Sequence, residues 1–127
     1  MNYQEALAFM SKAKDITKGR PTGQRGTRLI YDLHYETGLP VVTLKYHNTY
    51  LVQWTHDNTL FMNSGWCTPT TKKRLNEQLK DFNMGIVQRN YMWYLQRMDE
   101  AANIEEWSLS SYFLFSITPE GELKIKH

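Results

Sequence analysis

The sequence predicts an α+β fold: an antiparallel β-sheet of about six to eight strands, an N-terminal helix, and one helix packed on the sheet. Three observations predict it. Two segments repeat apolar residues at helical spacing, most other segments alternate apolar and polar residues as half-buried strands do, and short runs of turn-forming residues separate them. The chain of 127 residues has the size of one domain, so we expect residues 1–127 to form a single domain.

Residues 1–27 are expected to form an N-terminal helix and a basic connector. Asn2 and Glu5 have the spacing of a capping box, and apolar residues then recur at helical spacing over about residues 3–17. Residues 18–27 contain three glycines and several cations. This composition predicts a mobile connector without regular structure.

Residues 28–127 are expected to contain the sheet and a second helix. This helix spans about residues 69–82, because Thr68 supplies a capping hydroxyl and Pro69 suits the first helical position. Residues 98–108 are rich in acidic side chains and predict an acidic connector or a short helical turn. The expected strands are 28–35, 41–46, 49–54, 59–62, 86–89, 91–97, 112–117 and 122–126.

The second helix has a predicted buried face and a predicted polar face. Residues at helical spacing form the buried stripe, and charged residues fall opposite it on a helical wheel. The stripe is Thr71, Leu75, Leu79 and Phe82, with Lys73, Glu77 and Lys80 on the opposite face.

Charge is distributed unevenly along the chain, although the net charge is only +2. Residues 1–30 contain six basic and two acidic side chains, and residues 72–80 contain four basic side chains and one acidic one. Residues 81–127 contain seven acidic and four basic side chains. The two basic segments are therefore the candidates for contact with phosphate groups.

The composition excludes several classes of protein. With 41% hydrophobic and 13% aromatic residues the chain lies outside the disordered range. No apolar run approaches the roughly 18 residues that cross a membrane, and residues 1–20 lack the apolar segment of a secretory signal. We therefore expect a cytoplasmic protein. The single cysteine, Cys67, excludes an internal disulfide.

Catalytic motifs are missing from the sequence, and we expect neither enzymatic activity nor a cofactor. There is no P-loop, dinucleotide fingerprint or nucleophile elbow. Cys67 with His47 or His56 would form a thiolate pair if the start of the second helix lowered the cysteine pKa. The wide spacing of these three residues differs from that of structural zinc sites, so no metal site is expected.

One run of residues resembles the hallmark of a family of small proteins encoded by bacteriophages and prophages. In that family a strand rich in His-Asn-Thr, here His47-Asn48-Thr49, precedes a Gly-Trp-x-Thr-x-Thr-Thr-Lys-x-Arg-x-Asn run. Cys67 stands where the family has a basic residue, and Ser64 stands where it has a first glycine. The resemblance implies viral origin and the cytoplasm of an infected bacterial host, without implying an activity. The matching residues are Gly65, Trp66, Thr68, Thr70, Thr71, Lys72, Arg74 and Asn76.

The start of the second helix is the predicted binding site for a phosphate-bearing partner, DNA or RNA above all. Free backbone amides and the positive end of the helix dipole favour an anion there, and the nearby cations add to this. The alternative is that the threonines only cap the helix while the cations are a solvated surface. The predicted site residues are Trp66, Thr68, Thr70, Thr71, Lys72, Lys73, Arg74 and Asn76, with Arg20, Arg25 and Arg28 of the basic connector.

Trp66 has two possible positions. We expect it to be buried against the helix, because tryptophan side chains are mostly buried. The alternative is an exposed ring beside the basic residues, which is the pattern used to stack a nucleic-acid base while its phosphate is held.

Aromatic residues of the predicted strands favour a second function, that of a protein-binding inhibitor of a host protein. They are too numerous for one face of a small sheet, so some must be exposed, meet a host protein, or join two copies in a homodimer. We expect Trp54 and Trp93 to be among the exposed aromatic residues. The full set is Tyr31, Tyr35, Tyr46, Tyr50, Trp54, Trp93, Tyr94, Tyr112, Phe113 and Phe115.

Overall fold

The computed structural model describes residues 1–34 and 36–126, and these contain two α-helices, one 3-10 helix and ten strands. The helices are α1 (Tyr3–Met10), α2 (Pro69–Leu79) and the 3-10 helix η1 (Lys80–Phe82). The strands are β1 (Arg20–Pro21), β2 (Thr27–Leu33), β3 (Pro40–Tyr46), β4 (Thr49–Thr55), β5 (Leu60–Asn63), β6 (Met84–Arg89), β7 (Met92–Met98), β8 (Ile104–Leu109), β9 (Leu114–Ile117) and β10 (Leu123–Lys126).

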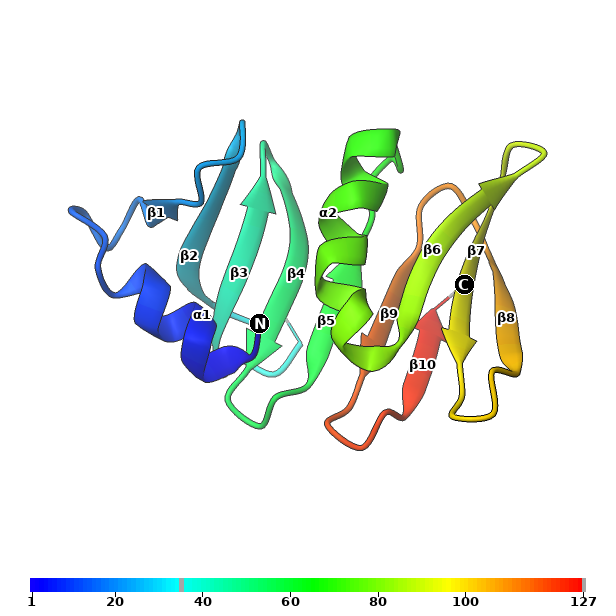
Figure 1. Ribbon diagram of the computed structural model, residues 1–127. Coiled ribbons are helices and arrows are strands. Elements are labelled where there is room, and N and C mark those ends of the chain that lie inside the picture. Colours follow the sequence, from blue (N-terminus) through cyan, green and yellow to red (C-terminus); the bar gives the residue numbers. More distant parts are fainter. Residues whose placement is uncertain (35, 127) are drawn as a thin grey trace.

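The strands form two antiparallel sheets, which confirms the predicted α+β class. The large sheet has seven strands in the order β1-β2-β3-β4-β5-β9-β10, and the small sheet has three in the order β6-β7-β8. Figure 1 shows α1, α2 and the small sheet side by side in front of the large sheet. The chain therefore leaves the large sheet after β5, builds α2 and the small sheet, and returns to pair β9 with β5.

Helix α1 begins where the capping box predicts. The Asn2 side chain accepts from the Glu5 N–H at 2.9 Å, and the Glu5 carboxylate accepts from the Asn2 N–H at 3.1 Å. The helix ends at Met10 instead of reaching residue 17. One reason is that the Asp15 carboxylate accepts from both the N–H and the hydroxyl of Thr17, a local turn that competes with helical geometry.

Helix α2 and η1 together occupy the predicted range. Thr68 is the N-cap and Pro69 the first helical residue. Leu75 and Leu79 are fully buried between the helix and the sheets, and Phe82 is half-buried. The helix is thus anchored along its length by the stripe that its spacing predicts.

The acidic segment 98–108 was expected to be a connector or helical turn, and that expectation is wrong for most of it. Strand β8 begins at Ile104 and pairs with β7. Cross-strand cations offset its acidic side chains: Arg97 lies 3.5 Å from Glu105, and Arg89 lies 2.7 Å from Glu106. These pairs, together with buried Leu109, explain why an acidic stretch forms a strand.

The predicted connector contains some regular structure. Arg20 and Pro21 form β1, which pairs with β2, and the remainder of residues 18–27 consists largely of turns. The strand predicted over 28–35 runs from Thr27 to Leu33, and Tyr35 lies outside the described residues. The strand predicted over 112–117 begins later, at Leu114.

Both sheets contribute to one hydrophobic core. Leu29 and Trp54 from the large sheet, Leu95 from the small sheet, and Leu79 from α2 belong to the same buried cluster. The indole N–H of Trp54 also donates to the Met1 carbonyl at 3.0 Å, which fixes the start of the chain against the sheet.

The opposite face of the large sheet is partly covered by the segment that follows β2. His34 is buried, and its ring centroid lies 4.3 Å from that of Phe61. Glu36 forms an ion pair with Lys126 on β10. Thr43 is also buried on this face, where its hydroxyl accepts from the Gln53 side-chain amide at 3.2 Å.

Candidate nucleic-acid interface

Two loops hold the candidate site together by extending the pairing of β5 with β9. The Ser64 N–H donates to the Phe113 carbonyl at 3.1 Å, and the Phe113 N–H donates to the Ser64 hydroxyl at 2.9 Å. Further along, the Cys67 N–H donates to the Ser111 carbonyl at 3.2 Å. The segments that carry Trp66 and Tyr112 are therefore joined by backbone hydrogen bonds on both sides.

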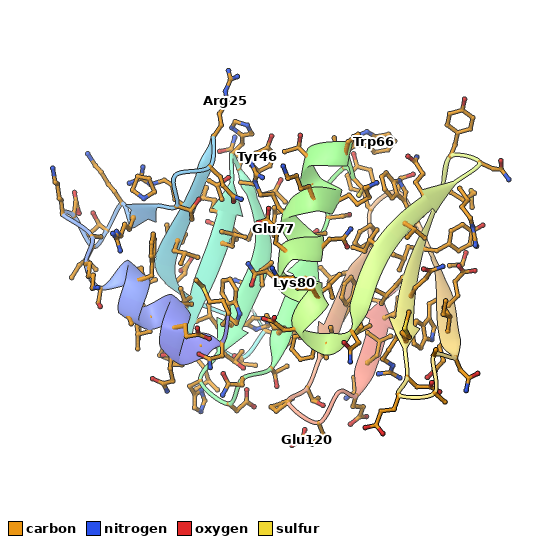
Figure 2. All side chains as sticks on the ribbon, viewed as in Figure 1. Arg25, Tyr46, Trp66, Glu77, Lys80 and Glu120 are labelled. Carbon is orange, nitrogen blue, oxygen red and sulfur yellow. The ribbon has the colours of Figure 1, made fainter. Side chains whose placement is uncertain are left out.

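Trp66 and Tyr112 form an exposed aromatic pair at the start of α2. Their ring centroids are 5.1 Å apart in an edge-to-face arrangement, and the residues are 61% and 64% exposed. Figure 2 shows Trp66 at the N-terminal end of the helix. The expectation that Trp66 is buried is wrong. Gly65, at φ +54°, turns the chain so that Cys67 takes the buried position while Trp66 points outward.

The capping threonines use their hydroxyls within the helix start. The Thr68 hydroxyl accepts from the Thr71 N–H at 3.2 Å and donates to the Thr71 hydroxyl at 3.1 Å. Thr71 is buried, whereas Thr70 is exposed. Of the three predicted threonines, Thr70 is therefore the one whose side chain a ligand would reach.

The three cations of the helix start lie in different environments. Lys73 is exposed, and Lys72 is half-buried near Cys67. Arg74 is only 9% exposed, with its guanidinium carbon 5.9 Å from the ring centroid of Tyr46. The prediction that Arg74 belongs to the ligand-facing surface is therefore wrong. Its spacing from Thr71 and Leu75 places it on the buried side of the helix, a signal that the sequence already contained.

Asn76 has a structural position instead of a ligand-facing one. Its side-chain amide donates to the Ile86 carbonyl at 3.0 Å and its oxygen accepts from the Ile86 N–H at 2.6 Å. The side chain thus pairs both backbone groups of a residue in β6. Its predicted role in binding is replaced by a role in joining α2 to the small sheet.

The arginines of the basic connector also differ in position. The Arg20 guanidinium lies 4.0 Å from the centroid of the Phe9 ring, and Arg28 donates to the carbonyls of Lys18 and Gly19 at 2.9 and 3.0 Å. Both side chains hold the connector in place. Arg25 is exposed, and Figure 2 shows it at the same end of the molecule as Trp66.

The two halves of the predicted motif meet in the fold. A Cβ atom added at Gly65 would lie 3.0 Å from the Thr49 side chain, so Gly65 is packed closely against β4. The contact between Arg74 and Tyr46 joins α2 to the end of β3. Much of the motif therefore builds the scaffold, and Trp66, Thr70, Lys72 and Lys73 remain at its surface.

Cys67 does not have the properties of an activated nucleophile. Burial raises the pKa of its thiol to about 11, against the expectation that the helix start would lower it; the charge of Lys72 opposes this rise only in part. The His47 ring packs against Tyr46 and Gly26. Among the described residues no group of three His, Cys, Asp or Glu side chains is arranged to hold a metal ion.

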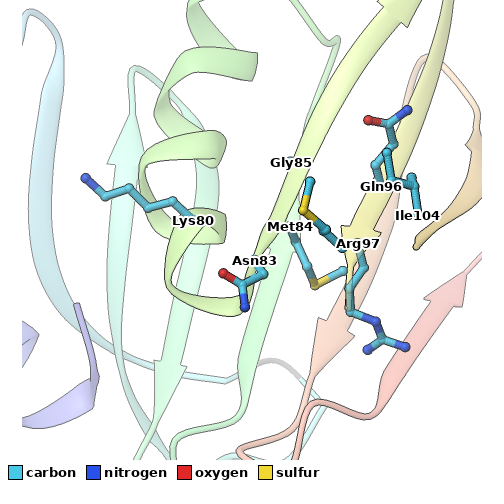
Figure 3. Close-up of a pocket in the computed structure, with 8 residues that line it drawn as sticks. Lys80, Asn83, Met84, Gly85, Gln96, Arg97 and Ile104 are labelled. Atoms are coloured by element: carbon cyan, nitrogen blue, oxygen red, sulfur yellow. The ribbon is translucent and has the colours of Figure 1, made fainter. Parts of the chain in front are cut away.

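A hollow of about 330 Å³ lies at the other end of α2, beside β6 and β7. Figure 3 shows Lys80 pointing away from the strands, while Arg97 extends beside Met84. Arg97 already donates to the Gly121 carbonyl at 2.7 Å. Of the two charged residues that line the hollow, one therefore points away from the strands and the other is already hydrogen-bonded.

The fold and the site define a small α+β protein whose main exposed feature is an aromatic pair beside the start of a basic helix. The family model described as Kyanoviridae Gp96 protein matches residues 9–114. Because this match covers most of the chain, the protein belongs to that family, which is a family of phage proteins. The predicted phage relationship is thereby confirmed, whereas the hallmark motif stays a prediction.

Two other comparisons found nothing: no curated protein and no solved structure matches the chain significantly. Within the described part of the chain, none of the helices has the length and apolarity needed to cross a bilayer.

Proposed function

We propose that this phage protein is a non-catalytic accessory protein that binds nucleic acid at the start of α2. The observation that carries the proposal is the exposed pair of Trp66 and Tyr112 at the start of a helix whose first residues include Lys72 and Lys73. Aromatic rings stack on bases, and lysines hold the phosphates between them. Arg25 adds a further exposed cation at the same end of the molecule.

The geometry suits a ligand that is held by stacking and charge together. Backbone hydrogen bonds fix both loops that carry the aromatic rings, so little backbone freedom remains to be lost on binding. The first turn of α2 contains no acidic side chain that would repel phosphate. A site of this kind binds without strong sequence preference, since every base presents a flat ring.

The test is fluorescence anisotropy of labelled single-stranded and duplex DNA and RNA at about 50 and 200 mM salt, a range over which phosphate binding weakens steeply. We expect Trp66→Ala to weaken binding at least about fivefold, because stacking is worth about 1–3 kcal/mol per base. Lys72→Gln with Lys73→Gln should flatten the slope of log K against log salt by about 1–2.

Two control variants remove residues of the same kinds, a lysine and an aromatic ring, at exposed positions away from the site. Lys80→Gln removes an exposed lysine from the other end of the helical segment, and Tyr91→Ala removes an exposed aromatic ring from the β6–β7 turn. Both should leave affinity and slope unchanged. Binding that is absent at low salt, or equal in the site and control variants, would refute the proposal.

A second candidate function, inhibition of a host protein, is supported by the outer face of the small sheet. Met92, Met98 and Ile104 are each about half exposed there. Trp54 and Trp93, the aromatic residues expected to form such a surface, are instead buried in the core, at 1% and 6% exposure. The candidate surface for a protein partner therefore lies on the small sheet, where Met98 and Ile104 are register partners and Met92 lies at the other end of β7.

A substitution that introduces a charge tests this second candidate. Ile104→Glu should abolish capture of a partner from host lysate at moderate salt, and Tyr91→Ala serves as the neighbouring control. Capture that survives Ile104→Glu would exclude this surface.

A further inference from the structure

The large sheet carries a second row of ligand-accessible side chains on its outer face, which is the face turned away from the helices. Side chains alternate along a strand, so Leu29 and Leu44 face the core while Arg28 and Lys45 face outward. On β2, β3 and β4 the outward register partners are Arg28, Lys45 and Tyr50, and on β5, β9 and β10 they are Asn63, Leu114 and Lys126. Tyr50 and Asn63 line the same hollow, which joins the two groups.

Three hollows follow one another along this row, with volumes of about 580, 220 and 290 Å³. Tyr50 lines the first and the second, and Phe61 and Leu114 line the second and the third. Because neighbouring hollows share these residues, they form one depression, which we name the outer trough. It crosses six strands, or about 24 Å at the usual spacing between strands.

The outer trough is positively charged. Five cations line it, against two acidic side chains, Asp32 and Glu36. Glu36 is paired with Lys126, whereas Arg28 donates to neutral carbonyl oxygens and keeps its charge. The excess of positive charge is complementary to a chain of phosphates. The five cations are Lys18, Arg28 and Lys45 at one end, and Lys124 and Lys126 at the other.

Aromatic rings form part of the trough floor. Tyr50 is 42% exposed, and the Lys45 ammonium lies 5.9 Å from its ring centroid. Phe61 is half-buried and supported from one side by His34. Rings on a sheet can stack only on bases that are not enclosed in a duplex, so this floor selects unpaired bases.

The trough meets the aromatic pair at one point of the sheet. Asn63 and Leu114 are register partners at the ends of β5 and β9. Trp66 is three residues after Asn63 and Tyr112 is two residues before Leu114, so the aromatic pair lies close to this edge of the sheet. This proximity allows one ligand strand to contact both surfaces.

We propose that the ligand is a single-stranded nucleic acid, which stacks on Trp66 and Tyr112 and continues along the outer trough. This inference rests on the proposed function, since it takes the aromatic pair as one end of the path. It adds a preference for single-stranded over duplex nucleic acid, and a second group of binding residues on the opposite face of the sheet.

The experiment compares a labelled oligodeoxythymidine of about 12 nucleotides with a duplex of the same length, by anisotropy at about 50 mM salt. The trough variants are Lys45→Gln with Lys124→Gln, and separately Tyr50→Thr, which keeps a strand-forming residue. We expect each to weaken single-strand binding at least about fivefold and to change duplex binding less than about twofold. Lys80→Gln and Tyr91→Ala are the controls, and circular dichroism verifies that each variant is folded.

The outcomes separate this inference from the proposed function. If the trough variants bind the single strand like the wild type while Trp66→Ala does not, the trough is overturned and the site at α2 stands. If the trough variants weaken single-strand binding while Trp66→Ala does not, the path through the aromatic pair and the proposed function are overturned, and the trough alone is the site. A wild-type protein that binds neither probe overturns both.

Discussion

The side chain of Asn76 satisfies both backbone polar groups of Ile86, which is itself buried. Asn76→Ala would leave these groups without partners, and we expect the free energy of unfolding to fall by about 2 kcal/mol. Urea denaturation followed by circular dichroism measures this change. Lys73→Ala on the same helix is the control and should change stability by less than about 0.5 kcal/mol. An equally small change for Asn76→Ala would show that the two hydrogen bonds contribute little.

The reactivity of the Cys67 thiol tests its burial, because burial raises its pKa to about 11. At pH 8 only about one thiol in a thousand is then ionised, and the thiolate is the reactive form. We expect a disulfide reagent to label the folded protein far more slowly than the protein unfolded in urea. The labelling rate of the folded protein should rise as the pH approaches 11, because a thiol with a raised pKa ionises only at higher pH. Equal rates in the folded and unfolded states would contradict the burial.

At the scale of single residues, the sequence predicts which residues gather at the helix start but not which way they face. The buried position of Arg74 follows from its spacing from Thr71 and Leu75, so the helical wheel contains this signal. The exposure of Trp66 has no such signal. It depends on the pairing of its loop with residues near Tyr112, which are distant in sequence.

At the scale of elements, the cap of α2 is the feature most open to test. Thr68→Ala removes the hydroxyl that accepts from the Thr71 N–H, and we expect a loss of about 1 kcal/mol in the free energy of unfolding. Thr68→Ser keeps the hydroxyl and should recover most of this loss. Thermal or urea unfolding distinguishes the two variants. Equal stability of Thr68→Ala and Thr68→Ser would mean that the hydroxyl does not act as a cap.

The elements that local chemistry determines are those that the sequence predicts best. Strands β3 and β4 are joined at His47 and Asn48 as expected, and the Gly121 N–H closes the predicted turn to Thr118 at 2.9 Å. Strand β8 could not be predicted in the same way, because Glu105 and Glu106 are accommodated by arginines of other strands. The division into two sheets depends on the pairing of β5 with β9. This pairing joins distant segments, so no local sequence pattern predicts it.

At the scale of the whole molecule, the shared core predicts that the two sheets unfold together. Leu95 of the small sheet is fully buried in the cluster that also contains Trp54 of the large sheet. Leu95→Ala should lower the free energy of unfolding by about 2–5 kcal/mol through the cavity it creates. Circular dichroism and tryptophan fluorescence should still give coincident transitions. Separate transitions would show that the sheets are independent.

The return of the chain to pair β9 with β5 has a consequence during protein synthesis. Leu60 pairs with Ile117, so the ribosome must add the whole of α2 and the small sheet before β5 receives its neighbour. At roughly 5–20 residues per second, this interval is on the order of several seconds. Throughout it, the free edge of β5 presents unpaired backbone groups to any other strand nearby. During this interval the edge of β5 is therefore a place where the nascent chain is open to mispairing.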